Sequence, residues 1–256
     1  MRADAPDREV AHAAELVARA RRVTVLSGAG VSTDSGIPDF RGPQGVWTRD
    51  PKAEAQSTLQ HYLADPAVRA AAWQSRLHSP AWNAQPNAGH RALLALEQRG
   101  VLHALITQNI DELHQQAGHA PERVIEVHGT MRRAMCWSCG RRQPMQNVLQ
   151  RVRAGEADPH CLDCGGILKS DTISFGQALV PEVIERAMTA ASQADLLLAI
   201  GSTLQVHPAA GVVPAAHDAG ARIVIVNAQA TPMDDLADAL IREPIGAVLP
   251  RLCGDG

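Results

Sequence analysis

The fold is decided by residues 23–41, which read VTVLSGAGVSTDSGIPDFR. The β-branched run at the start of this stretch predicts a strand, and the glycines at positions 28, 30 and 36 predict a tight turn directly behind it. Backbone N–H groups at such a turn hold phosphate oxygens, so a dinucleotide is the expected ligand. Alone, a strand followed by Gly-x-Gly is a weak signal, because ordinary strand-to-helix turns also use glycine.

The second half of the stretch, Ile37-Pro38-Asp39-Phe40-Arg41, is unusual for a connector. It places a rigid proline, a carboxylate, one of only two phenylalanines and a guanidinium in a row. Loops carry a large share of binding and catalytic side chains. We therefore expect this loop to form part of a site.

Length and charge set the class of protein. The 256 residues can bury a full core, and their formal charge of −3 gives no electrostatic argument for nucleic acid or an anionic membrane as a partner. No apolar run is long enough to span a bilayer, and residues 1–7 lack the apolar core of a signal peptide. We expect a cytoplasmic protein with neither nucleic acid nor membrane among its partners.

Short apolar runs recur along the chain, and each ends abruptly in small or polar residues. Together they give five candidate strands, at residues 23–26, 102–107, 124–127, 196–200 and 223–226. Helical patterns occur at residues 7–20, 87–100, 181–192 and 208–219. This alternation predicts an α/β fold with a mostly parallel, Rossmann-like sheet, in which ligands bind beyond the carboxyl ends of the strands.

The predicted strand ends carry a set of polar groups. They read Gln108-Asn109, His128-Gly129, Gly201-Ser202-Thr203 and Asn227. Each has an ordinary structural explanation: Asn109 or Asp111 caps a helix, and a single histidine at a strand end is a hydrogen-bonding group. Their combination at one edge of one sheet favours a binding site.

Four of the five cysteines form two Cys-x-x-Cys pairs, Cys136/Cys139 and Cys161/Cys164. Two such pairs are typical of a tetrahedral Zn²⁺ site, and four thiolates leave no open position, so the ion is expected to be structural. A redox dithiol is the competing interpretation for one pair. Cys253 is interpreted as an incidental thiol.

At this point the motifs resemble those of the sirtuins. The resemblance covers nearly the whole chain and is carried, in order, by residues 28–41, Gln108-Asn109-Ile110-Asp111, His114-x-x-Ala117-Gly118, His128-Gly129, the two Cys pairs, Phe175-Gly176 and Asn227. It implies a Rossmann-like NAD-binding domain at residues 1–41, 86–129 and 175–256. Residues 42–85 would form a helical insert and residues 130–174 a zinc-ribbon insert, and the two inserts together would make up the small domain.

The chain departs from the usual sirtuin pattern at three places. It has Lys169-Ser170-Asp171 where Lys-Pro-Asp is usual, Phe175-Gly176-Gln177 for Phe-Gly-Glu, and Gly201-Ser202-Thr203 for Gly-Thr-Ser. These changes bear on peptide and cofactor contacts and leave the catalytic set intact.

The resemblance also implies the partners of individual residues. NAD would contact Gly28, Ala29, Gly30, Ser32, Ile37, Pro38, Asp39, Phe40, Arg41, Trp47, Gln108, Asn109, Ile110, Asp111, Gly201, Ser202, Thr203, Asn227, Ala228, Gln229 and Ile245. An acyl-lysine peptide would contact His128, Ile173, Phe175 and Gly176. The catalytic residues would be His128, Asn109 and Asp111, and the zinc ligands the four paired cysteines.

The implied reaction is NAD-dependent removal of an acyl group, most of all acetyl, from protein lysine. The acyl oxygen would attack C1′ of the ribose as nicotinamide leaves, and His128 would be the general base for a ribose hydroxyl. The products would be lysine, nicotinamide and O-acyl-ADP-ribose.

Three alternatives stay open from the sequence. The first is a hydride-transferring oxidoreductase, but this chain does not present the acidic ribose ligand that such an enzyme would have at the end of a second strand. A non-catalytic zinc-ribbon binding module leaves His128 and Asn109 unexplained. A mono-ADP-ribosyltransferase would use the same activated C1′ with another nucleophile.

The acyl preference is predicted from Trp73-Gln74-Ser75-Arg76. Sirtuins that remove acidic acyl groups resemble one another in a Tyr-x-x-Arg at this place, and here Trp73 stands for the tyrosine. Half of a carboxylate clamp is therefore missing, and we expect acetyl and other uncharged groups to be preferred over succinyl or malonyl. The alternatives are a deacylase for longer or acidic groups, and an Arg76 that simply faces solvent.

Overall fold

The computed structural model describes residues 5–39, 42, 45, 49 and 58–254. Its strands are β1 (Val23–Ser27), β2 (Leu102–Thr107), β3 (Val124–Glu126), β4 (Gly129–Cys136), β5 (Arg142–Pro144), β6 (Leu168–Thr172), β7 (Leu196–Ile200), β8 (Arg222–Val226) and β9 (Ala239–Ile241). Its α-helices are α1 (Ala5–Arg19), α4 (Leu59–Ala64), α5 (Pro66–Leu77), α6 (Ala88–Gln98), α7 (Leu113–Ala117), α8 (Met145–Arg153), α9 (Pro181–Ser192), α10 (Val212–Asp218) and α11 (Ile245–Cys253). Short 3-10 helices include η1 (Ala29–Ser35) and η2 (Pro80–Trp82).

Six strands form one parallel sheet in the order β3-β2-β1-β7-β8-β9. This is the doubly wound order in which the chain leaves the first strand in opposite directions in its two halves. The reversal lies between β1 and β7, and in doubly wound sheets ligands bind beside this point, beyond the carboxyl ends of the strands. The sequence-based prediction of a Rossmann-like sheet is confirmed.

Apolar side chains cover both faces of this sheet, as parallel strands require. On one face Val23, Val25 and Leu105 pack against α1, α6 and α11. On the other face Leu26, Ile106 and Ile225 pack against α9 and α10. Alternation along β1 and β2 thus sends successive side chains into two separate cores, and all five residues of β1 are buried.

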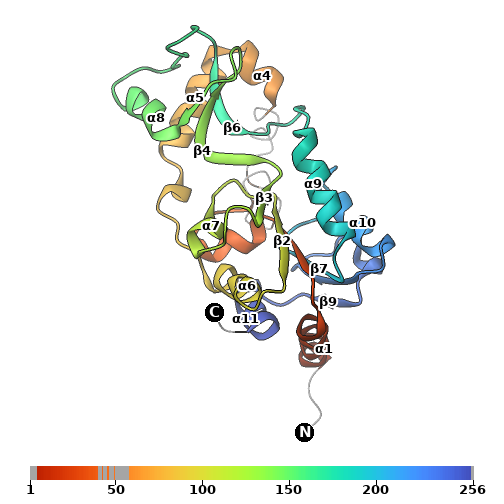
Figure 1. Ribbon diagram of the computed structural model, residues 1–256. Coiled ribbons are helices and arrows are strands. Elements are labelled where there is room, and N and C mark those ends of the chain that lie inside the picture. Colours follow the sequence, from red (N-terminus) through yellow and green to blue (C-terminus); the bar gives the residue numbers. More distant parts are fainter. Residues whose placement is uncertain (1–4, 40–41, 43–44, 46–48, 50–57, 255–256) are drawn as a thin grey trace.

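A smaller sheet, β5-β4-β6, is antiparallel and lies above the large sheet in Figure 1, together with α4, α5 and α8. It has its own apolar cluster, built around Trp73 of α5, Met145 and Leu149 of α8, and Leu168 of β6. Strand β4 begins at Gly129, directly after His128, and leads from β3 of the large sheet into the small sheet.

Several elements were not anticipated from the sequence, among them β9 and α8. Strand β9 has only three residues, and no apolar run of that length is distinctive. Helix α8 lies between the two cysteine pairs, where Val148, Leu149 and Val152 bury one face in the small cluster. Residues 42–85 were expected to form a helical insert, and α4, α5 and η2 occur in the described part of this region.

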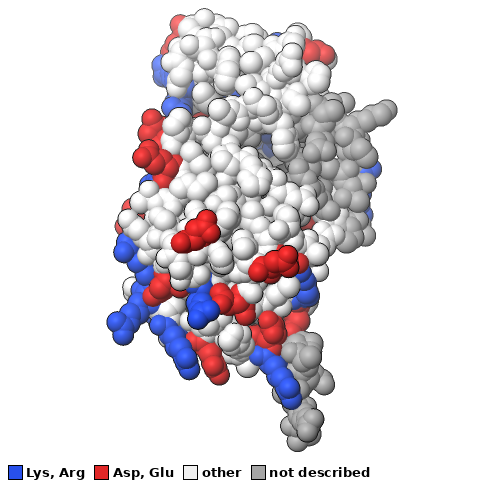
Figure 2. Space-filling model, turned by 90° about the vertical axis from the view of Figure 1, so that its right-hand side faces the viewer, with Lys and Arg blue, Asp and Glu red and all other residues white. Residues whose placement is uncertain are grey.

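Charged side chains of both signs gather at one end of the face shown in Figure 2, the end that carries α1, and the middle of that face is largely uncharged. Among the described residues no helix is long and apolar enough to cross a membrane.

Candidate active site

The glycine turn after β1 fits against the loop after β7 at close range. Gly28 N–H donates to the Ile200 carbonyl and Gly30 N–H to the Gly201 carbonyl, both at 2.9 Å. A Cβ atom at Gly28 would lie 2.6 Å from the Gly201 oxygen, and one at Gly30 would lie 2.7 Å from the Gly201 Cα. In this structure the two glycines therefore provide close approach of backbones, and their N–H groups are already bonded within the protein.

Buried side chains behind the turn form a second layer of the site. The Asn109 amide donates to the Gly28 carbonyl at 3.1 Å and lies 3.2 Å from Ser32 Oγ. The Ser32 hydroxyl donates to Asp111 Oδ2 at 2.8 Å, and the Leu113 N–H donates to Asp111 Oδ1 at 3.0 Å. Burial raises the pKa of Asp111, and these two donors oppose the rise. The structure thus joins the loop after β2 to the glycine turn.

His128 lies at the end of β3, and its ring has a fixed orientation. Its Nδ1 is 2.9 Å from the carbonyl oxygen of Gln108. A carbonyl only accepts, so Nδ1 carries the proton and Nε2 of the neutral ring holds a lone pair. Burial lowers the pKa of His128, with the Gln108 bond opposing. The Gln108 side chain donates to Ser202 Oγ at 2.8 Å, which connects the β2 and β7 loops.

A chain of buried hydrogen bonds supports Asn109 from below. His114 Nε2 lies 2.9 Å from Ser27 Oγ, which donates to Thr107 Oγ1 at 2.9 Å. The same Thr107 oxygen accepts the N–H of Asn109 at 3.1 Å. The His114 ring also packs at 4.9 Å, centroid to centroid, from His90. The loop that carries the predicted catalytic residues is therefore held by the interior of the protein.

The amino end of α6 holds the glycine turn from the other side. The Asn87 amide donates to the Val31 carbonyl at 2.8 Å and to Ser35 Oγ at 3.0 Å, while its oxygen caps the helix. His90 completes the cap, because its Nδ1 accepts the Asn87 N–H. Sequence reasoning anticipated the Asn87 cap but not its contact with the glycine turn, nor the roles of Ser27, Thr107 and His90.

The four paired cysteines come together as one cluster, with all four Sγ atoms within 4.8 Å of one another. The Sγ distances are 3.5 Å for Cys136–Cys164 and 3.9 Å for Cys139–Cys161. A tetrahedral ion with Zn–S bonds of about 2.3 Å needs sulfurs about 3.8 Å apart, so the cluster fits Zn²⁺. The Cys139 N–H also points to Cys136 Sγ at 3.5 Å, as expected in a zinc knuckle.

The remaining predicted residues lie at several places. Ile37 N–H donates to the Ser32 carbonyl, Asp39 accepts the Gly42 N–H, and the Ile110 carbonyl accepts the Met131 N–H. Asn227 follows β8, where Arg242 donates to its carbonyl and to that of Gln229, and Ile245 begins α11. Pro38 is exposed and Ala29 half-buried beside the turn, Thr203 and Ala228 follow β7 and β8, and Phe40, Arg41 and Trp47 lie outside the described residues.

The predicted substrate segment leads out of β6. Ile173 N–H donates to the His128 carbonyl at 2.9 Å, and the Phe175 carbonyl accepts the Leu59 N–H at 2.9 Å. Gly176 has a left-handed backbone with φ of 77°. The segment therefore passes from His128 to the start of α4.

Arg76 does not face solvent. Its guanidinium carbon lies 5.5 Å from the Tyr62 ring centroid and 5.1 Å from that of Trp73. Burial lowers its pKa, and its Nη1 has no hydrogen-bond partner within the described chain, nor has Trp73 Nε1. The interpretation of Arg76 as a solvent-facing residue is wrong, because the two aromatic rings cover it.

The Sir2 family model matches residues 28–208, the span that holds the glycine turn, the β2 and β3 loops and the cysteine cluster. The chain belongs to the Sir2 family.

Two relatives illustrate the likeness. NAD-dependent protein deacetylase 2 of Streptomyces coelicolor is 53% identical over 230 residues, which cover 90% of this chain and 95% of that protein. The NAD-dependent protein deacetylase of Saccharolobus solfataricus is 40% identical over 227 residues, 89% of each chain.

Solved Sir2 structures share the whole fold. One with a deacetylated p53 peptide and 3′-O-acetyl-ADP-ribose superposes with a TM-score of 0.88 at 31% identity, covering 96% of this chain and 98% of that one. Another, of Sir2 with p53 peptide and NAD⁺, has a TM-score of 0.82 at 32% identity and covers 93% and 94%. The resemblance found in the sequence is thereby confirmed at the level of the family.

Proposed function

We propose that this chain removes acyl groups, acetyl first, from lysine side chains of proteins in an NAD-dependent reaction. The observation that carries the proposal is the His128 ring, whose Nε2 keeps a lone pair because Nδ1 is bonded to the Gln108 carbonyl. Its partner Gln108 precedes Asn109, which bonds to the glycine turn at the reversal point of a doubly wound sheet, where dinucleotides bind. The named relatives are NAD-dependent protein deacetylases.

NAD, when bound, supplies an activated ribose carbon that releases nicotinamide. The residues around it have separate tasks. Asn109 and Asp111, immobilised by Ser32 and Gly28, would orient the cofactor. His128 Nε2 would accept a proton from a ribose hydroxyl, and its lowered pKa keeps it neutral at working pH.

We propose that the other predicted contacts follow the same plan. Gly201, Ser202 and Thr203 would face the phosphates from β7, and Asn227, Ala228, Gln229 and Ile245 would surround the adenosine end. Residues 1–41, 86–129 and 175–256 would make the NAD-binding domain, and residues 42–85 and 130–174 the small domain. A soluble enzyme of the cytoplasm, without nucleic-acid partners, agrees with the composition.

The acyl-lysine peptide would lie along Ile173–Gly176 and pair with it as an added strand. This segment begins at the carbonyl of His128, so a peptide there would present its lysine to the base. Main-chain bonds give affinity with little side-chain specificity, and many acyl-lysine sequences should be accepted.

One observation favours a second candidate, removal of acidic acyl groups. Arg76 is a buried guanidinium that no carboxylate partners within the described chain, and the adjacent Trp73 N–H is also unpaired. An acyl carboxylate would satisfy both donors. We nevertheless expect acetyl to be preferred, because Trp73 stands where a tyrosine would complete the clamp.

The experiment measures kcat/KM of the wild-type protein and of Arg76→Leu on acetyl, butyryl and succinyl peptides of one sequence. Mass spectrometry identifies the products. Acetyl should give the higher kcat/KM, with O-acetyl-ADP-ribose and nicotinamide as products. A succinyl preference that vanishes in Arg76→Leu would replace the acetyl proposal with the acidic one. ADP-ribose attached to protein, without free O-acyl-ADP-ribose, would indicate a transferase.

A further inference from the structure

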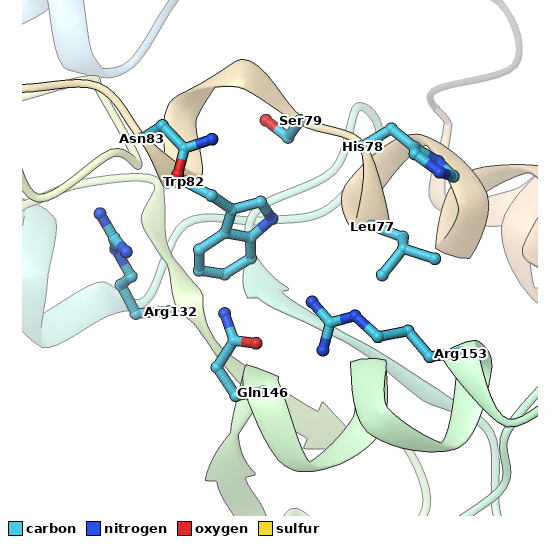
Figure 3. A pocket seen from close by; sticks show the side chains of 8 residues that line it. All are labelled: Leu77, His78, Ser79, Trp82, Asn83, Arg132, Gln146 and Arg153. Atoms are coloured by element: carbon cyan, nitrogen blue, oxygen red, sulfur yellow. The ribbon is translucent and has the colours of Figure 1, made fainter.

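A cavity of about 400 Å³ opens between the end of α5, η2 and α8 (Figure 3). It is lined by Leu77, His78, Ser79, Trp82, Asn83, Arg132, Gln146 and Arg153. Small-molecule pockets are typically about 300–1,000 Å³, so the space suits a ligand of metabolite size.

The charge of this cavity is of one sign. Arg132 and Arg153 line it and no carboxylate does. Within the described chain, neither guanidinium has a carboxylate oxygen within 4 Å, whereas neighbouring arginines are paired. Arg151, two positions before Arg153 on α8, is an example: its Nη2 binds Glu156 Oε1 at 2.6 Å. A concave surface with unpaired cations concentrates anions.

The wall of the cavity is fixed in advance. The Trp82 indole N–H donates to the Arg76 carbonyl at 2.6 Å, which holds the ring in place. The Arg132 guanidinium carbon lies 5.0 Å from the centroid of this ring. Figure 3 shows Arg132 and Arg153 on opposite sides of the indole, with Gln146 between them. Two guanidinium groups and an amide thus line one cavity around an aromatic side chain.

Arg132 also reaches the active-site loop. Its Nη2 lies 3.4 Å from the carbonyl oxygen of Asp111, a long hydrogen bond. A ligand that drew the guanidinium further into the cavity would lengthen this bond, because the guanidinium nitrogens move together as one rigid plane. Occupancy of the cavity would then change the loop that carries Asn109 and Asp111.

We infer that this cavity binds a phosphate monoester of mononucleotide size or smaller between Arg132 and Arg153, and that its occupancy alters NAD binding through Asp111. Guanidinium forks match the oxygens of a phosphate dianion and bind it in bidentate fashion. The Trp82 ring provides an apolar surface for the organic part. The site is separate from the NAD and peptide contacts proposed above.

The test is calorimetric titration of the full-length protein, saturated with NAD, with AMP, ribose 5-phosphate and inorganic phosphate. Arg153→Gln removes one arm of the site, and Arg151→Gln, on the same helix, is the matched control. We expect at least about tenfold weaker binding in Arg153→Gln and wild-type binding in Arg151→Gln, since a charge-assisted hydrogen bond is lost only in the first.

The three probes separate the sources of the phosphate. Tighter binding of AMP or ribose 5-phosphate than of inorganic phosphate supports an organic ester, and equal binding of all three overturns that part and leaves a simple phosphate site. Absence of binding at millimolar concentration, or equal binding in wild type and Arg153→Gln, overturns the site itself.

Coupling to the active site has its own readout. The KM for NAD should shift when the best probe is added to wild type and stay constant in Arg153→Gln, while both proteins turn over equally without the probe. Tight binding with no change of KM would overturn the coupling through Arg132.

Discussion

The large and the small sheet are stabilised by different means. The parallel sheet has a continuous apolar core on each face, and Ser27, Thr107 and Asn109 form a buried hydrogen-bonded chain behind the glycine turn. The small sheet has one modest cluster, and beside it lie the four cysteines and exposed ion pairs such as Arg151–Glu156. Apolar burial therefore supports the part that holds the NAD loops, and coordination supports the part that covers them.

This difference has a functional side. The proposed roles of Asn109 and His128 require fixed positions. Buried hydrogen-bond partners in the large sheet and its loops provide them. Under the proposed function, the small sheet positions residues 168–176 for the peptide, and a metal cluster is sufficient to stabilise such a small unit.

The largest effect is expected from Cys161→Ala. Structural zinc contributes about 10–16 kcal/mol to folding in small zinc domains, so this variant should lose zinc and the cooperative folding of β4–β6 while the parallel sheet stays folded. Metal analysis and region-resolved hydrogen exchange measure both. Cys253→Ala, in α11 and outside the cluster, should keep one zinc per chain. Full protection of β4–β6 from hydrogen exchange in zinc-free Cys161→Ala would show that coordination does not stabilise the small sheet.

The next effect is on rate alone. His128→Ala should lower deacylation by about 10²–10⁴-fold, the usual contribution of a general base, and leave NAD binding measurable. Because burial lowers the pKa of His128, the wild-type rate should hold as the pH falls below 6.5 and decline only at the lower pKa. Exposed His12→Ala serves as control. Wild-type turnover in His128→Ala would remove the base assignment.

A smaller effect concerns the pH dependence of stability. Burial, with His119 and Arg91 nearby, lowers the pKa of His90 from 6.5 to about 4. Below pH 6.5 the unfolded chain binds a proton at His90 and the native protein does not. The folding free energy that the neutral His90 contributes above pH 6.5 is therefore lost as the pH falls toward 4. The loss between pH 7.5 and 5 is about 2 kcal/mol for this group. Urea unfolding at both pH values should show a flatter dependence in His90→Gln and an unchanged one in His12→Gln.

The smallest effect is expected from Arg151→Gln. Its pair with Glu156 is half exposed, and such surface ion pairs contribute less than about 1 kcal/mol. Chemical unfolding should place the variant within that range of wild type, and the zinc content should not change. A loss of zinc here would mean that ion pairs, as well as coordination, hold the small sheet together.

The sequence allowed prediction wherever a residue type has few alternative uses. The cysteine spacing gave the metal cluster, and the apolar runs gave five of the six parallel strands, because buried parallel strands need continuous β-branched or aliphatic runs. Asn109, Asp111 and His128 were predicted from their positions after strands together with the sirtuin resemblance. In the structure Asn109 and Asp111 share Ser32 as a partner, and His128 bonds to the carbonyl of Gln108.

Other features required the tertiary structure, since they depend on residues far apart in the chain. Gly28 is constrained by Gly201, Asn109 depends on Ser27 and His114 through Thr107, and Arg76 is buried by Tyr62 and Trp73. Arg132 and Arg153 line the same cavity, on either side of Trp82, only because α8 lies beside η2. Local sequence determines strands, turns and ligand spacing through backbone preference. Which groups become neighbours in the interior, and which charges are left without a partner, is decided by packing alone.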